Sequence, residues 1–141
     1  MNIFIVENSG AARVSLQSAL SDMPEVKVVG HALNESGAIQ RIGALLPDVV
    51  VLDLGLQSGS GVSVLEHIKK HHATIKVIVF THYTDEFCID RCKRAGADYF
   101  FDKSSQFMQL REVLWKWMHT DRLDNKFRPD NKLNALQVAG R

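Results

Sequence analysis

The chain has 141 residues and a formal net charge of +1, with 45% hydrophobic and 23% charged residues. This is the profile of one ordinary globular domain that is long enough to bury a core, and its scattered Lys and Arg residues disfavour nucleic acid as a direct partner. No apolar run approaches the roughly 20 residues that cross a bilayer, and the amino terminus has no signal-peptide pattern, so we expect a cytoplasmic protein with no membrane partner.

Short β-type runs alternate with helical segments along the chain. Strands are predicted at Asn2–Val6, Val26–Ala32, Val49–Leu52, Ile75–Phe80 and Tyr99–Phe101. Amphipathic segments predict helices over Ala11–Met23, Glu35–Leu46, Ser60–His71, Glu86–Ala95 and Ser104–Met118, with N-cap residues at Ser9, Asn34, Ser60, Asp85 and Ser104. Three of the strand runs are almost continuously apolar, as in strands buried on both faces. The alternation predicts an α/β fold, a doubly wound parallel sheet with right-handed crossovers.

The composition changes near His119, where a polar stretch begins. Residues 119–141 contain few large apolar side chains, and we expect either an extended tail or a short extra helix through Leu133–Val138. This segment is too short to be an effector domain. The predicted organisation is therefore a single domain over residues 1–118 followed by a polar C-terminal extension over 119–141.

Trp115 and Trp117 are expected to face different sides of the last predicted helix of the domain. One of them is expected in the core. The other is a candidate for a contact surface, because Trp is enriched at protein interfaces.

Polar side chains follow four of the five predicted strands. They are Glu7 and Asn8 after the first strand, Asp53 after the third, Thr81 after the fourth and Lys103 after the fifth. In a doubly wound sheet, ligands bind at the carboxyl ends of the strands, so we expect these five residues to converge at one edge. Each of them alone has an ordinary explanation, such as helix capping, strand propensity or solvation. Their shared edge favours a functional site.

The chemistry of this set fits phosphoryl transfer. A carboxylate can accept a phosphoryl group, and the reaction depends mainly on positioning and charge neutralisation. Mg²⁺ neutralises charge when one or two carboxylates hold it. A hydroxyl group and a lysine can bind the remaining phosphoryl oxygens.

In order and spacing, these residues resemble the receiver domain of two-component response regulators. The segments FIVEN (4–8), VVVLDLGLQSGSG (49–61), VIVFT (77–81) and GADYFFDKS (96–104) carry the resemblance, which extends over about Met1–Met118. It implies a flavodoxin-like fold, a five-stranded parallel sheet of order 2-1-3-4-5 with five flanking helices. It also implies a phosphoprotein that acts in signal transduction or a phosphorelay.

The resemblance assigns a role to each site residue. Asp53 would accept a phosphoryl group from a sensor histidine kinase or phosphotransfer protein, and Lys103 and Thr81 would engage that group. Mg²⁺ or Mn²⁺ would be held by Glu7, Asn8, Asp53 and the backbone carbonyl of Gly55. Thr81 and Phe100 would be the switch residues, with Phe100 turning inward. The protein would not be an enzyme, apart from Mg²⁺-dependent self-phosphorylation and autodephosphorylation.

Three positions depart from the family pattern. Asn8 stands where a second acid is usual, His82 where a small residue is usual, and Gln57 where proline is frequent. His82 and the neighbouring Tyr83 are expected to modulate access to Asp53. Asn8 and His82 motivate an alternative, a degenerate receiver that acts as a phosphorylation-independent protein-interaction module. An enzyme on the same kind of sheet is disfavoured, because the first strand–helix turn lacks a dinucleotide-binding glycine pattern.

The sequence also predicts how such a receiver would act. The expectation is a stand-alone, single-domain receiver with no output domain of its own, which acts on an unknown downstream protein. The sequence leaves the formation of a homodimer open.

Overall fold

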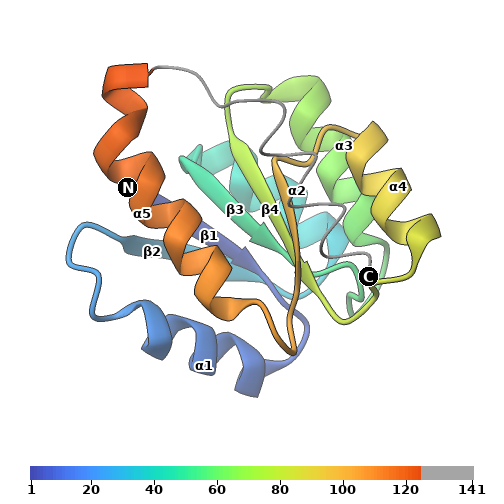
Figure 1. Ribbon diagram of the computed structural model, residues 1–141. Coiled ribbons are helices and arrows are strands. Elements are labelled where there is room, and N and C mark those ends of the chain that lie inside the picture. Colours follow the sequence, from blue (N-terminus) through green and yellow to red (C-terminus); the bar gives the residue numbers. More distant parts are fainter. Residues whose placement is uncertain (125–141) are drawn as a thin grey trace.

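The computed structural model describes residues 1–124, and describes side chains as far as residue 119. Within this range the chain forms a five-stranded parallel sheet between two layers of helices (Figure 1). The strands are β1 (Asn2–Val6), β2 (Lys27–Ala32), β3 (Val49–Leu52), β4 (Lys76–Thr81) and β5 (Tyr99–Asp102). They pair in the order β2-β1-β3-β4-β5. The predicted fold class and strand order are confirmed.

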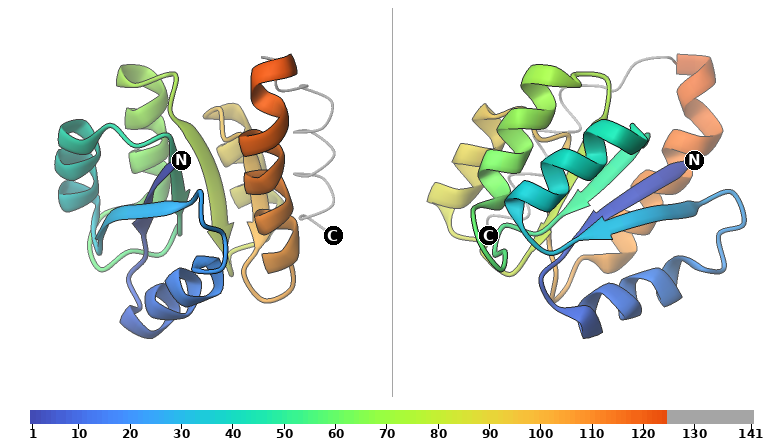
Figure 2. Two further views of the ribbon diagram at one scale, coloured as in Figure 1. Left: turned by 90° about the vertical axis from the view of Figure 1, so that its left-hand side faces the viewer. Right: turned by 180° about the vertical axis from the view of Figure 1, so that it is seen from behind.

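Helices cover both faces of the sheet (Figure 2). They are α1 (Gly10–Leu20), α2 (Glu35–Leu45), α3 (Gly61–His71), α4 (Glu86–Arg94) and α5 (Phe107–Asp124). Helices α2, α3 and α4 pack on one face around one hydrophobic cluster, and α1 and α5 pack on the other face around a second cluster. No helix within residues 1–124 combines the length and apolar character that a membrane span needs.

Strand β1 shows why the runs are almost continuously apolar. Successive side chains of a strand point to opposite faces, so Phe4 and Val6 enter the cluster under α2–α4, while Ile3 and Ile5 enter the cluster under α1 and α5. All four are at most 1% exposed. Burying one such side chain contributes about 1.5–3 kcal/mol, so both faces of the strand stabilise the sheet.

Four of the five predicted N-caps are confirmed. The side chains of Ser9, Asn34, Ser60 and Asp85 accept backbone N–H bonds at the starts of α1, α2, α3 and α4. Ser104 was wrongly predicted as a cap, because α5 begins only at Phe107. The backbone N–H of Ser104 instead donates to the Asp102 carboxylate, and those of Ser105 and Gln106 donate to the Asp102 carbonyl, which closes a turn before the helix.

Helix α5 extends beyond the predicted end at Met118 and continues to Asp124. The change in composition at His119 therefore does not mark the end of the helix, because polar residues are compatible with a solvated helix surface. The predicted extra helix at Leu133–Val138 lies outside the described residues. Trp117 is 6% exposed and packs on Tyr99, whereas Trp115 is 51% exposed, as expected for one core and one surface residue.

Candidate functional site

Backbone hydrogen bonds continue the parallel ladder one residue beyond the strands and position the candidate residues. The N–H of Asp53 donates to the carbonyl of Val6 at 2.9 Å, which places Asp53 beside Glu7. The N–H of Lys103 donates to the carbonyl of Thr81 at 2.9 Å. The strands all point to this edge (Figure 1), so residues far apart in sequence meet there.

Four of the predicted residues form one buried, charged cluster. The ammonium of Lys103 lies 2.5 Å from Glu7 Oε1 and 2.7 Å from Asp53 Oδ2. The hydroxyl of Thr81 donates to the other carboxylate oxygen, Asp53 Oδ1, at 2.7 Å. The side chains of Lys103, Glu7 and Asp53 are only 13%, 7% and 11% exposed, and Thr81 is fully buried. We call these four residues the buried cluster.

Lys103 remains a cation in this environment. Burial alone would lower its pKa, but its hydrogen bonds to Asp53 and Glu7 outweigh burial, so the pKa lies above the ordinary lysine value of 10.5. Two carboxylates facing one ammonium leave a net negative charge when both acids are ionised. This net negative charge suits a bound cation, or a phosphoryl group whose own negative charge is partly neutralised by a cation.

The loops around the buried cluster fix its acids. Glu7 Oε2 accepts the N–H of Ser9 at 3.0 Å, so the start of α1 holds this carboxylate. The N–H of Gly55 lies 3.4 Å from Asp53 Oδ1. A Cβ at Gly61 would lie 2.3 Å from the backbone oxygen of Asp53, so only glycine allows α3 to start this close to the acid.

A turn that the sequence interpretation missed positions Lys103. The Asp102 carboxylate accepts hydrogen bonds from both the backbone N–H and the hydroxyl of Ser104. The backbone N–H of Asp102 donates to Gln106 Oε1 at 2.8 Å. The bonds from Ser104 lower the pKa of Asp102. Asp and Ser are frequent turn residues, and the sequence DKSS (102–105) contains one Asp and two Ser residues, so a signal for this turn was present.

Phe100, the predicted switch aromatic, is fully buried in the core cluster under α2–α4. Thr81, the predicted switch hydroxyl, already contacts Asp53. The structure therefore shows a buried Phe100 and a Thr81 hydroxyl bonded to Asp53, and the switch role of the two residues stays a prediction.

The remaining candidates lie on the exposed rim of the site, and we call Asn8, His82 and Tyr83 the rim residues. His82 Nδ1 lies 3.5 Å from Ser104 Oγ, beside the turn that follows β5. The backbone N–H of Tyr83 donates to Thr81 Oγ1 at 3.2 Å. The Tyr83 ring packs against Gly55, where an added Cβ would lie 2.8 Å from Cε2. His82 therefore lies next to Ser104, and Tyr83 covers part of the loop that follows Asp53.

The donor set at this edge fits a weakly held Mg²⁺ ion. Glu7 and Asp53 supply two carboxylates joined through Lys103, and Asn8, the residue after Glu7, is exposed and carries an amide. Mg²⁺ often binds proteins through one or two carboxylates and keeps several water ligands. Among the described residues, no three His, Cys, Asp or Glu side chains gather as a metal site.

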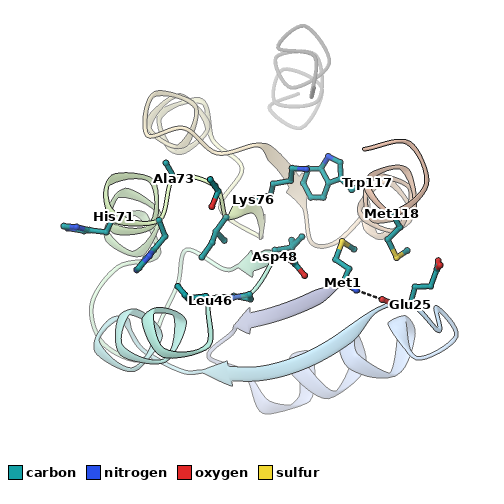
Figure 3. A pocket seen from close by; sticks show the side chains of 14 residues that line it. Met1, Glu25, Leu46, Asp48, His71, Ala73, Lys76, Trp117 and Met118 are labelled. Atoms are coloured by element: carbon teal, nitrogen blue, oxygen red, sulfur yellow. Dashed lines mark hydrogen bonds between the residues drawn. The ribbon is translucent and has the colours of Figure 1, made fainter. Parts of the chain in front are cut away.

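A hollow at the opposite edge of the sheet carries none of the candidate residues (Figure 3). It has a volume of about 900 Å³, and Met1, Asp48 and Lys76 line it at the starts of strands. The Met1 ammonium donates to the Glu25 carbonyl at 2.7 Å on its wall. The candidate residues therefore lie outside this hollow.

Comparison with known proteins agrees with this site. A family model described as the response regulator receiver domain matches residues 3–115. The response regulator protein VraR of Staphylococcus saprophyticus is 27% identical over 116 residues, which cover 82% of this chain and 56% of that protein. The chain thus spans little more than half the length of this curated relative.

Solved structures share the fold. A signal receiver domain of a DNA binding response regulator from Colwellia psychrerythraea 34H is 28% identical, with a TM-score of 0.74, and the match covers 84% of this chain and 98% of that chain. A two-component response regulator of the LuxR family from Aurantimonas sp. SI85-9A1 has a TM-score of 0.78 at 22% identity, covering 97% of this chain and 95% of that chain. At that identity the second likeness concerns the fold alone.

Proposed function

This chain belongs to the response regulator receiver domain family, and from that premise we propose that it accepts a phosphoryl group on Asp53 and thereby switches a protein-interaction face. Receiver domains are generally signalling modules rather than enzymes. The observation that supports the proposal most directly is the buried cluster. It presents one carboxylate whose two oxygens are already engaged by an ammonium and a hydroxyl.

In the proposed reaction, a carboxylate oxygen of Asp53 attacks the phosphorus of a phosphohistidine on a partner protein. The new O–P bond forms as the P–N bond breaks, and its electron pair returns to the imidazole of the partner, which takes up a proton. Lys103 supplies positive charge to the phosphoryl oxygens, and Thr81 supplies a hydrogen bond. Both therefore lower the free-energy cost of bringing the negative phosphoryl group to the negative Asp53 carboxylate.

Glu7, Asn8, Asp53 and the Gly55 carbonyl are the proposed ligands of Mg²⁺, or of Mn²⁺ in its place. When bound, the ion would supply charge neutralisation between the carboxylates and the phosphoryl oxygens. Asn8 contributes an oxygen without a negative charge, so binding should be weaker than at a site with three acids. Mg²⁺-dependent self-phosphorylation from a small phosphodonor and autodephosphorylation belong to the same proposal.

The proposed partners are a sensor histidine kinase or a phosphotransfer protein upstream, and an unidentified protein downstream, in the cytoplasm. The described surface gives no reason to add a direct nucleic-acid contact, although one relative is described as DNA binding. The interaction face would be the one formed by α4, β5 and α5, since Phe100 lies in β5 and Thr81 ends β4 next to it.

One observation favours a second candidate function, a degenerate receiver that binds its partner without phosphorylation. Thr81 already contacts Asp53, and Phe100 is already buried, the arrangement that the family resemblance assigns to the phosphorylated form. In that case the interaction face would be set permanently, and partner affinity would not depend on a phosphodonor.

The test is intact mass after incubation with Mg²⁺ and acetyl phosphate. The proposal predicts one added phosphoryl group on the native chain, and none on Asp53→Ala or in the presence of EDTA. The adduct should be lost in hydroxylamine, which cleaves acyl phosphates. A native chain that stays unlabelled while an ordinary receiver is labelled in the same tube would favour the degenerate receiver.

A further inference from the structure

The loop that begins with Asp53, residues 53–60, is tied to the first residue of α2. This residue is Glu35, and its carboxylate accepts the backbone N–H of Ser60 at 2.9 Å. The backbone N–H of Glu35 donates to the carbonyl of Ser58 at 3.1 Å. We call these two bonds the α2 clasp. A carboxylate is a strong acceptor for a backbone N–H, and the two bonds run in opposite directions, so the clasp fixes the loop against the helix.

Gly59 leaves the space that the clasp needs. Its φ of 81° lies in the left-handed region that favours glycine. A Cβ at this position would lie 2.4 Å from Glu35 Cβ and 2.5 Å from Glu35 Oε1, and real Cβ atoms do not approach other atoms so closely. The backbone conformation and the position of the Glu35 side chain therefore both require glycine here.

A third bond holds the middle of the same loop. The backbone N–H of Gln57 donates at 3.0 Å to the carbonyl of Leu33, which lies in the turn between β2 and α2. Gln57 stands where proline is frequent in the family, and a proline has no N–H to donate. In this chain, hydrogen bonds to the turn and to α2 therefore restrict the loop in place of a proline ring.

The α2 clasp reaches the candidate site through Ser60. The backbone of Ser60 pairs with that of Gly55 in an antiparallel bridge across the loop. The N–H of Gly55 lies 3.4 Å from Asp53 Oδ1, and the carbonyl of Gly55 is a proposed ligand of Mg²⁺. The contacts that lead from Glu35 to the proposed metal site therefore pass through two backbone segments of one short loop.

We propose that Glu35 is a positioning residue of the metal site: through Ser60, its carboxylate holds the Gly55 carbonyl in place to bind Mg²⁺. The inference rests on the proposed function, in which Gly55 is a metal ligand. Asn8 contributes no negative charge to that site, so binding depends more on a well-placed backbone oxygen. Groups that orient the ligands of a metal typically change its affinity about 10–100-fold when they are removed.

NMR titration of the isotope-labelled full chain with Mg²⁺, without any phosphodonor, tests the proposal. The shifts of backbone amides near Asp53 give the dissociation constant of Mg²⁺. Glu35→Ala should bind Mg²⁺ about tenfold more weakly or worse, because no side-chain oxygen remains to accept the Ser60 N–H. Glu35→Gln should lose about threefold at most, because its amide oxygen still accepts that bond as a neutral group.

Asp48→Ala is the matched control. The Asp48 carboxylate also accepts a backbone N–H, that of Asn2 at 2.7 Å, but at the opposite edge of the sheet. This variant should bind Mg²⁺ as the native chain does. Amide hydrogen exchange without Mg²⁺ gives a second readout. The Ser60 amide should exchange faster in Glu35→Ala than in the native chain, and the amides of β3 should exchange at the same rate in both.

A second variant breaks the α2 clasp from the side of the loop. The Cβ that Gly59→Ala adds would lie 2.4 Å from Glu35 Cβ, so it should displace the carboxylate and weaken Mg²⁺ binding by a similar factor. Thermal melting of each variant checks folding. If Glu35→Ala does not fold, Gly59→Ala and Glu35→Gln still test the clasp.

Three results would overturn the proposal. The first is equal Mg²⁺ affinity in the native chain and in folded Glu35→Ala. The second is an equal loss of affinity in Glu35→Gln and Glu35→Ala, which would assign the effect to charge rather than to the bond. The third is an equal loss in Asp48→Ala, which would assign it to stability.

The titration also separates this inference from the proposed function. A native chain that binds no Mg²⁺ would refute both the proposed metal site and the role of Glu35. A native chain that binds Mg²⁺ through the clasp but is not phosphorylated would support the role of Glu35 and refute phosphorylation of Asp53.

Discussion

The two halves of the functional site differ in how far they follow the family pattern. The buried cluster of Glu7, Asp53, Thr81 and Lys103 matches the family pattern at all four positions, and its side chains are joined by bonds of 2.5–2.7 Å. The rim residues Asn8, His82 and Tyr83 are exposed, and two of them depart from the pattern.

Burial explains the difference. Inside the protein an unpaired charge is costly, and removing one member of a buried ion pair leaves the other uncompensated. The four groups of the buried cluster therefore depend on one another. The rim residues contact water, so a substitution there leaves no buried charge without a partner. Changes in the buried cluster should act on folding and chemistry together, whereas changes on the rim should act on metal affinity and access.

The largest effect is expected for Lys103→Met. Loss of the ammonium should reduce phosphorylation of Asp53 by about 10²–10³-fold, as for removal of one charged donor from a reacting oxyanion. It should also lower the free energy of unfolding by about 3 kcal/mol, because Glu7 and Asp53 then face each other unpaired. Mg²⁺ should recover part of that stability. Urea unfolding with and without Mg²⁺, and intact mass with acetyl phosphate, measure the two effects.

Lys69→Met is the matched control for that variant. Lys69 also pairs with a buried acid, Asp98, at 2.8 Å, but away from the site. The Lys69→Met variant should have a lower free energy of unfolding that Mg²⁺ does not restore. It should be phosphorylated at the native rate. A Lys103→Met protein that behaves in the same way would show that the buried cluster has a structural role only.

The next effect is expected for Thr81→Val, which keeps the shape of the side chain and removes its hydroxyl. A hydrogen bond to a charged group contributes about 1.5–3 kcal/mol, so phosphorylation should slow by about tenfold or more. Thr81→Ser, which retains the hydroxyl, should stay near the native rate. Equal rates for the Val and Ser variants would show that the bond of 2.7 Å to Asp53 has no part in the reaction.

The stability difference between the native chain and Lys103→Met should depend on pH. The folded-state pKa of Lys103 lies above its ordinary value of 10.5, so its stabilising contribution is fully present below pH 10.5 and is lost as the pH rises through the raised pKa. Burial raises the pKa of Tyr99 to about 12, and Tyr99 lies outside the buried cluster, so its titration should cancel in the difference. Urea unfolding at a series of pH values from neutral upward should give a constant difference to about pH 10.5 and a smaller difference above it, and a difference that already shrinks just above neutral pH would contradict the assignment.

The smallest effect is expected for His82→Ala. The exposed ring lies beside Ser104, and interactions of exposed groups contribute at most about 1 kcal/mol. The rate of phosphorylation should change by less than about threefold. A much larger increase would show that His82 blocks access, and a much larger decrease would show that it contacts the phosphoryl group.

Much of the fold could be predicted, because two sequence patterns indicate the same sheet: the apolar strand runs and the polar residues that follow them. Strands such as Val49–Leu52 are apolar on both faces and are buried throughout, and the residue after each strand then falls on one edge. The first residue of α5 could not be predicted from the same pattern. Ser104 is a good cap by residue type, but its N–H and its hydroxyl bond the Asp102 carboxylate and form a turn instead. Which of the two arrangements forms, cap or turn, depends on the local backbone conformation.

The site could be predicted as a set of residues but not as a network. The sequence placed Lys103 and Asp53 at one edge, and it did not reveal that one ammonium joins Asp53 to Glu7. The sequence also predicted a switch role for Phe100, but it did not predict that this side chain is fully buried. The burial of a strand side chain depends on the helices that cover the sheet.

The most direct test of the contrast between the two halves is a Mg²⁺ titration of phosphorylation by acetyl phosphate, read by intact mass for the native chain and Asn8→Asp. The account predicts that both proteins reach the same final level of one phosphoryl group. The variant should need about tenfold less Mg²⁺ for half-maximal labelling, the effect of about 1.4 kcal/mol from one added carboxylate near the ion. A native chain that stays unlabelled at every Mg²⁺ concentration, while Asn8→Asp is labelled, would contradict the claim that Asn8 weakens Mg²⁺ binding without preventing phosphorylation of Asp53.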